Sequence, residues 1–107
     1  MKTTKIDARG IRFSEDVDGL EVGRAHLYIM HNELHKRPFG LMEDVYVNPD
    51  CQGQGIGSRL VNELIATAER EGCYKLIATS RHERDRVHSL YIKLGFSDRG
   101  TEFRMNF

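Results

Sequence analysis

Residues 45 to 60 read Val45-Tyr46-Val47-Asn48-Pro49-Asp50-Cys51-Gln52-Gly53-Gln54-Gly55-Ile56-Gly57-Ser58-Arg59-Leu60. The pattern is that of an apolar strand passing through a glycine-rich turn into a helix. Glycine at 53, 55 and 57 removes every second Cβ atom, so backbone N–H groups can approach a bulky anion. The following helix would point its unpaired N-terminal N–H groups at that anion. The stretch therefore predicts a phosphate-binding loop, although the glycines alone would also suit a tight connection.

Two better-known glycine motifs do not fit this spacing. A dinucleotide-binding G-x-G-x-x-G motif that begins at Gly53 would need a glycine where Ser58 stands. A Walker loop ends in G-K-[ST], whereas this stretch has Gly57-Ser58-Arg59. The loop is therefore neither a dinucleotide fingerprint nor a P-loop.

Length and composition predict one domain spanning residues 1–107. Sixteen basic and sixteen acidic residues cancel, so no field of one sign would draw nucleic acid or an anionic membrane. The sequence has no signal-like N-terminus and no membrane-length apolar run, and its two cysteines suggest reduced thiols, so we expect a cytoplasmic protein. His31 and His35 lack a third ligand, so we expect no metal site.

The chain ahead of the loop predicts a hairpin followed by another strand. Imperfect alternation over 5–13 suits a strand with a bulge at Arg9-Gly10, and the acidic segment 14–19 suits the turn. A second strand is expected over 20–30 and a third over 40–47.

The chain after the loop predicts a β-α-β crossover and a second helix. Apolar residues at helical spacing from Ile56 to Ala68 indicate the first helix, and 74–79 indicates a buried strand. Ser80 and Glu83 have capping-box spacing ahead of a helix that would end at Gly95. Alternation over 101–107 predicts a closing edge strand.

Two motifs make the sequence resemble the GNAT superfamily of N-acetyltransferases. The first is the family's Q/R-x-x-G-x-G/A pyrophosphate signature, represented by Gln52, Gly55 and Gly57. The second is Arg84-Asp85-Arg86-Val87-His88-Ser89-Leu90-Tyr91-Ile92-Lys93-Leu94-Gly95-Phe96, which is similar to R-x-x-A-H-x-F-Y-x-x-L-G-F. The resemblance implies a single-domain α/β acyl-CoA N-acyltransferase fold with a mixed, mostly antiparallel sheet and two main helices.

The resemblance also implies acetyl-coenzyme A (acetyl-CoA) as co-substrate. Its pantetheine arm would pair with the strand backbone around Val45, Tyr46 and Val47. Its pyrophosphate would lie on the loop made of Gln52, Gly53, Gln54, Gly55, Ile56, Gly57 and Ser58. Arg84 would meet the adenosine phosphates, or would only solvate its helix face.

Transfer to an amine requires three groups: a base for the amine proton, donors for the carbonyl oxygen and an acid for the leaving thiolate. Tyr91 matches the family's general acid, and the backbone N–H groups between Val45 and Val47 would face the oxyanion. Glu43 or Asp44 would take the amine proton, directly or through water. Adjacent strand residues point to opposite faces, so at most one of the two approaches the site.

The chain also departs from the family pattern. The family usually has a further strand and two helices ahead of the hairpin, which form much of the acceptor site, whereas only about nineteen residues precede Leu20. Gln52 stands where Arg is commoner, which removes a charge near the pyrophosphate. A non-catalytic acyl-CoA-binding or protein-interaction module is therefore the alternative. A second copy of the chain in a homodimer would be another way to complete the pocket. The final strand, with Phe103, Met105 and Phe107, would contribute to that dimer or would only pack internally.

Overall fold

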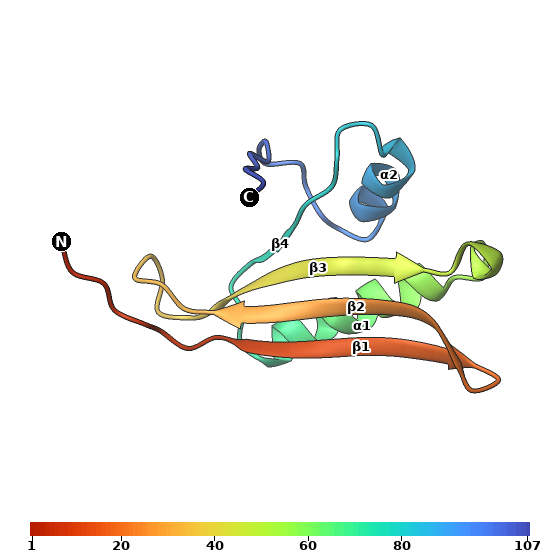
Figure 1. Ribbon diagram of the computed structural model, residues 1–107, viewed down its shortest axis with the longest axis horizontal. Helices are drawn as coiled ribbons and strands as arrows, with labels where there is room; N and C mark the ends of the chain where they lie inside the picture. The colour runs from red at the N-terminus through yellow and green to blue at the C-terminus, as the bar shows by residue number, and fades with distance from the viewer.

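The computed structural model describes residues 1–107 as four strands and two α-helices (Figure 1). The strands lie side by side in the order β1-β2-β3-β4, and α1 crosses from β3 to β4. The elements in chain order are β1 (Arg9–Val17), β2 (Leu20–Met30), β3 (Phe39–Val47), a short 3₁₀ turn η1 (Pro49–Cys51), α1 (Ile56–Arg70), β4 (Leu76–Ala78) and α2 (Asp85–Lys93).

The sheet is mixed, as the sequence predicts. β1 pairs with β2 and β2 with β3 in antiparallel register, whereas β4 runs parallel to β3 over only three residue pairs, the last of which is Met42 with Ala78. The register slips twice, between Glu15 and Asp16 and again along β3 opposite Ala25. The expected fold class of two main helices on a mostly antiparallel sheet is confirmed.

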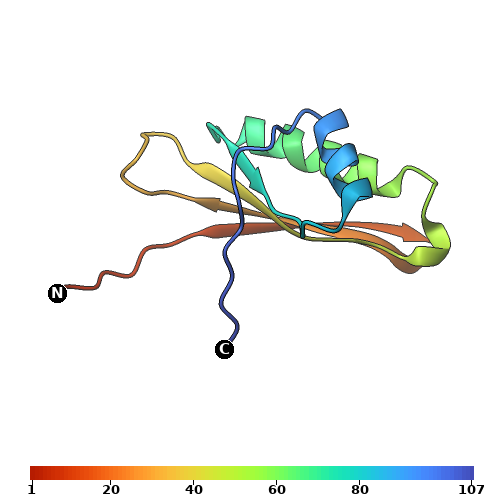
Figure 2. The same ribbon diagram turned by 90° about the horizontal axis from the view of Figure 1, so that it is seen from above.

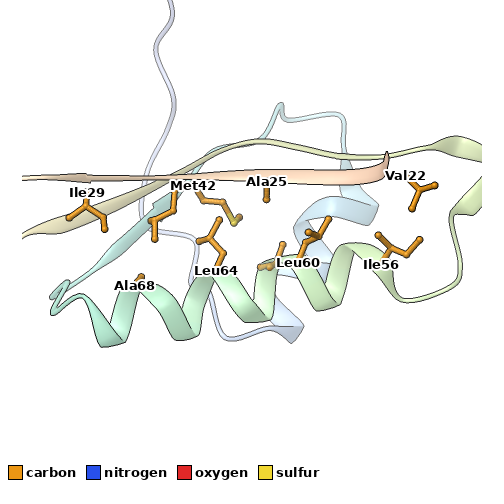
Figure 3. Packing of buried hydrophobic residues seen from close by; sticks show 10 residues of the cluster. Val22, Ala25, Ile29, Met42, Ile56, Leu60, Leu64 and Ala68 are labelled. Carbon is orange, nitrogen blue, oxygen red and sulfur yellow. The ribbon is translucent and has the colours of Figure 1, made fainter. Parts of the chain in front are cut away.

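α1 and the sheet together form the core (Figure 3). Side chains from β2 and β3 point at the apolar stripe of α1. The buried residues of this stripe recur every three or four positions along the helix. Leu27 and Leu64 are fully buried at the centre of this contact. The buried cluster comprises Val22, Ala25, Leu27, Ile29, Met42, Ile56, Leu60, Val61, Leu64 and Ala68.

Both helices lie on the same side of the strand layer (Figure 2). No helix covers the other face of β1–β3, which we call the open face. Arg12, Arg24 and His26 alternate with residues that face α1, and they therefore lie on this open face. Neither helix has the length and hydrophobicity needed to cross a bilayer.

The first strand differs from its prediction because the turn is tighter. Asp18 and Gly19 both have positive φ, 52° and 79°, and Val17 pairs directly with Leu20. Those angles are those of a two-residue hairpin turn, in which Asp-Gly is strongly favoured. The strand therefore runs over Arg9–Val17 rather than 5–13, and its irregularity lies at Glu15 and Asp16 rather than at Arg9-Gly10.

The predictions for the last third of the chain are partly wrong. α2 begins at Asp85 with no side-chain cap, and the hydroxyl of Ser80 is buried without a partner rather than capping a helix. The strand expected over 74–79 is shortened to Leu76–Ala78. The closing strand over 101–107 does not form. Alternating apolar residues determine which side chains would share a face of a sheet, but they do not provide a strand to pair with. Phe103 and Phe107 are accordingly exposed.

Candidate active site

The glycine loop between η1 and α1 has a backbone that only glycine adopts freely. Gly53 and Gly55 have φ of 84° and 80°, in the left-handed region. A Cβ atom on Gly53 would meet nothing within 4 Å, so the loop surface there is open to an incoming group. Gly57 has an ordinary φ, and its added Cβ would only touch Val47 at 3.5 Å.

The N-terminus of α1 opens directly onto this loop. Gly55 is the N-cap and offers no side chain to the helix, and the first helical hydrogen bond is from Arg59 N to Gly55 O at 3.0 Å. The N–H groups of Ile56, Gly57 and Ser58 therefore have no acceptor within the chain. Three such donors at the positive end of a fifteen-residue helix are the kind of arrangement that favours an anion.

Arg59 holds the loop against the first strand. Its Nη1 donates to the carbonyl of Gln54 at 3.1 Å, while Nε and Nη2 donate to Glu15 Oε1 at 3.1 and 2.7 Å. The carbonyl of Gln54 is thereby engaged by the guanidinium of Arg59. Sequence reasoning missed this contact because residues 15 and 59 are brought together only by the packing of β1 against α1.

The second half of β3 has an unpaired edge beside this loop. β4 stops pairing at Ala78, so β3 from Glu43 onward has no neighbour on its outer side. Asp44 has φ of 50°, and together with Val45 it lies opposite the single residue Ala25. This is a β-bulge with a non-glycine residue in the left-handed region, a conformation that costs about 1–3 kcal/mol. The bulge lies within the backbone stretch expected to hold the acyl group.

Tyr91 of α2 is half-buried and packs against the core cluster. Its ring packs on Phe96 with centroids 5.3 Å apart, and its carbonyl accepts from Phe96 N at 2.9 Å. Burial raises the pKa of the Tyr91 phenol, Arg84 opposes that shift and the charge of Glu43 adds to it. The phenol therefore stays protonated at neutral pH, in the electrostatic field of both charged residues.

Glu43 and Asp44 have different surroundings. Asp44 accepts two hydrogen bonds from Arg24, at 2.9 Å from Nε and 3.1 Å from Nη2, and this bidentate contact holds the pKa of Asp44 below its usual value. His26 Nδ1 lies 3.5 Å from the same carboxylate. Glu43 is exposed and has no ion pair within the chain, and its charge reaches Tyr91. Sequence reasoning also missed Arg24, because the bulge that joins it to Asp44 leaves no sequence signal.

Arg84 is the N-cap residue of α2 and is exposed beside a shallow cavity of about 320 Å³. The cavity is lined by residues 83–87 only. Val45 and Val47, expected to pair with pantetheine, are half-buried against the core, and Tyr46 between them is exposed. Gln52 and Gln54 lie exposed on the loop. No group of three or more His, Cys, Asp or Glu side chains lies close enough together to hold a metal ion.

The family model described as "Acetyltransferase (GNAT) family" matches residues 7–96. The chain belongs to this family. The GNAT chain is 34% identical over 105 residues to an aminoglycoside N(6')-acetyltransferase type 1 of Stenotrophomonas maltophilia, a match covering 92% of this chain and 69% of the relative. It is 33% identical over 95 residues to a glucosamine 6-phosphate N-acetyltransferase of Trypanosoma brucei brucei, covering 88% of this chain and 63% of the relative.

A solved structure described as a putative acetyltransferase from Agrobacterium tumefaciens has the same fold as this GNAT chain. It superposes with a TM-score of 0.85 at 28% identity, over 92% of this chain and 69% of that one. Among the curated relatives named above and a probable glucosamine 6-phosphate N-acetyltransferase of Oryza sativa, the chain spans between 39% and 69% of the relative's length.

Proposed function

We propose that this chain is an acetyl-CoA-dependent N-acetyltransferase that acts on a primary amine of a small molecule or peptide by direct attack. The observation that carries the proposal is the loop geometry: two glycines with left-handed backbones lead into a helix whose first three N–H groups have no acceptor. That arrangement suits a pyrophosphate. The matched relatives named as acetyltransferases of aminoglycosides and glucosamine 6-phosphate support the amine as acceptor.

In the proposed reaction the amine nitrogen attacks the thioester carbon, the C–N bond forms and the C–S bond breaks. Backbone N–H groups between Val45 and Val47 stabilise the carbonyl oxygen while it carries negative charge. Tyr91 gives its proton to the departing thiolate, and its raised pKa keeps that proton available. The attacking amine must be uncharged, and its nitrogen, which becomes positive as the C–N bond forms, must lose a proton to give the neutral amide.

Glu43 is the better supported acceptor of the amine proton. It has no ion-pair partner, and its charge acts on Tyr91, whereas the carboxylate of Asp44 is already engaged twice by Arg24. A carboxylate whose pKa is held low is a weak base, so Asp44 is the less suitable of the two. The transfer from amine to Glu43 takes place directly or through water.

Thermal unfolding with and without acetyl-CoA tests the cofactor site. Ligand at about 100 times Kd should stabilise the folded chain by roughly 2.7 kcal/mol. A thiol-release assay with a panel of aminoglycosides, amino sugars and lysine analogues then tests transfer. An unchanged unfolding temperature would refute the cofactor site. A shift without thiol release would favour a non-catalytic acyl-CoA-binding module, for which the uncovered open face is the supporting observation (Figure 2).

Replacing Tyr91 with Phe tests the acid. The variant keeps the ring that packs on Phe96 but lacks the proton, so kcat should fall by about 10²-fold or more while the Kd of acetyl-CoA is unchanged. Unchanged turnover would remove Tyr91 from the mechanism.

We further propose a homodimer and a cytoplasmic location. The dimer is supported by two features: the apolar residues of the tail are exposed, and β4 pairs with a neighbour on one side only. The tail of one copy could therefore pair as an added strand with the unpaired edge of β4 in the other copy. The location is supported by Cys51 and Cys73, which are both free thiols, as is usual in a reducing compartment.

A further inference from the structure

Arg24 of β2 contacts both neighbours of Val45. Its guanidinium donates two hydrogen bonds to Asp44, at 2.9 and 3.1 Å, and its Cζ atom lies 4.7 Å from the ring centroid of Tyr46. Arg24 is also the Cα partner of Tyr46 in the sheet register, directly beyond the bulge. One side chain therefore holds the residue before Val45 by an ion pair and the residue after it by a cation–π contact.

The bulge needs such support because β3 is held from one side only at this point. Pairing with β4 ends at Met42, so beyond it the strand is fixed by β2 alone. On the β2 side the ladder itself is interrupted opposite Ala25. Asp44 in a left-handed conformation is strained, and its backbone would relax toward ordinary strand angles without an opposing contact.

We propose that Arg24 is a positioning residue for acetyl transfer: through Asp44 and Tyr46 it fixes the direction of the backbone N–H groups at Val45 that receive the carbonyl oxygen. This inference rests on the proposed function. Under this proposal Asp44 has a structural role: its carboxylate holds the guanidinium of Arg24 in place, and it does not act as the base. The pyrophosphate loop lies beyond Val47, outside the stretch that Arg24 contacts.

Arg24→Ala tests the proposal, with Arg12→Ala as the matched control. Arg12 lies on the same open face and makes a still closer bidentate pair with Glu21, at 2.6 and 2.7 Å. Its charge also acts on Asp44, but it makes no hydrogen bond or ion pair with a residue of the bulge. Amide hydrogen exchange of residues 43–47, measured without acetyl-CoA, should accelerate in Arg24→Ala and remain at the wild-type rate in Arg12→Ala.

Kinetics give the second readout. We expect kcat to fall about 10- to 100-fold in Arg24→Ala, because misdirected donors lose transition-state contacts. KM for acetyl-CoA should rise by a smaller factor, because the pyrophosphate loop beyond Val47 is unchanged while the strand expected to pair with pantetheine is loosened. Arg24→Lys, which keeps the charge but cannot form the bidentate contact, should restore part of kcat. Asp44→Asn should behave like Arg24→Ala, and the double variant should lose no more than either alone, because both changes break one contact.

Three outcomes would overturn the proposal. The first is wild-type exchange at 43–47 in both Arg24→Ala and Asp44→Asn. The second is an equal loss in Arg12→Ala, which would indicate a general stability effect. The third is full turnover in Arg24→Ala with none in Asp44→Asn, which would identify Asp44 as the base. If the wild-type protein transfers no acetyl group, the proposed function fails, while the exchange experiment still decides whether Arg24 holds the bulge.

Discussion

Gly23 of β2 and Ile56 of α1 approach each other so closely that a methyl group on Gly23 would come within 2.8 Å of Ile56 Cγ2. The same methyl group would lie 2.9 Å from Leu60 Cδ1. Ile56 is the first residue of α1 and directly follows the glycine loop. The absence of a side chain in β2 therefore determines how near the N-terminus of α1 lies to the sheet.

Replacing Gly23 with Ala should both destabilise the fold and displace the start of α1. Overpacking of this kind typically costs about 1–3 kcal/mol, which denaturant unfolding would measure. Gly10→Ala is the matched strand variant, because its Cβ would meet only the exposed ring of Tyr28, at 3.2 Å, rather than buried core side chains. An equal decrease in the free energy of unfolding in the two variants would show that the close contact between Gly23 and Ile56 does not determine the position of α1.

The ionisation of Tyr91 should depend on its two charged neighbours. Tyrosine ionisation can be followed by absorbance at alkaline pH. Subtracting the titration curve of Tyr91→Phe from that of the wild type gives the ionisation of Tyr91 alone. Its pKa should lie above the ordinary value because of burial, fall in Glu43→Gln, and rise in Arg84→Gln. Shifts in the opposite directions, or none, would mean that neither charge acts on Tyr91.

The raised pKa of Tyr91 also predicts a loss of stability at alkaline pH. The folded state favours the neutral phenol, so its contribution is fully present below the unfolded pKa of about 10. It is lost as pH rises through the higher pKa of the folded protein. The free energy of unfolding should therefore fall more steeply with pH in this range for the wild type than for Tyr91→Phe. Parallel curves would contradict the assignment.

Alanine at Gly55 should weaken acetyl-CoA binding, whereas alanine at an equally strained glycine outside the loop should not. Gly55→Ala forces a side chain into a left-handed conformation, so it should cost about 1–2 kcal/mol and weaken acetyl-CoA binding about tenfold or more. Gly72→Ala is the control, since Gly72 also has a positive φ, 83°, but follows the far end of α1 and lies outside the loop. Calorimetric titration measures both affinities, and an unaltered Kd in Gly55→Ala would show that the loop does not bind the cofactor.

The tail offers a direct test of the dimer. Phe103 is 92% exposed, so Phe103→Glu should change the stability of a single chain by no more than about 0.5 kcal/mol. In a dimer built on the tail the same change should release single chains, which light scattering coupled to gel filtration would detect. Asn106→Glu, on the alternate face of the tail, is the control. A wild-type protein that elutes as a single chain would refute the dimer.

The sequence predicts well those features that depend on local pattern. The glycine spacing from Gly53 to Gly57 and the helical stripe from Ile56 to Ala68 both follow from neighbours a few residues apart, and the structure has both. The extent of β1 was mispredicted because Ser14-Glu15-Asp16-Val17 looks like an acidic turn. The Asp18-Gly19 turn signal decides otherwise, because two positive φ angles close the hairpin in two residues.

Contacts that depend on register could not be predicted in the same way. The bulge at Asp44 arises from the pairing of β2 with β3, and no residue type in 43–47 signals it. The ion pairs of Arg24 with Asp44 and of Arg59 with Glu15 join residues 20 and 44 positions apart. The prediction of a closing strand was wrong for a related reason. The alternation from Thr101 to Phe107 shows which side chains would share a face, but a strand also needs a second strand to pair with.

The buried cluster lies wholly between Val22 and Ala68, so the glycine loop is joined to the core more firmly than Tyr91 is. α2 contributes no fully buried residue and touches the cluster only through half-buried side chains around Tyr91. Segments with few buried contacts open locally at a lower free energy than the global transition. We therefore expect α2, which carries the proposed acid Tyr91, to open locally while the glycine loop stays folded. A ligand that contacts both α2 and the loop would make the two segments unfold together.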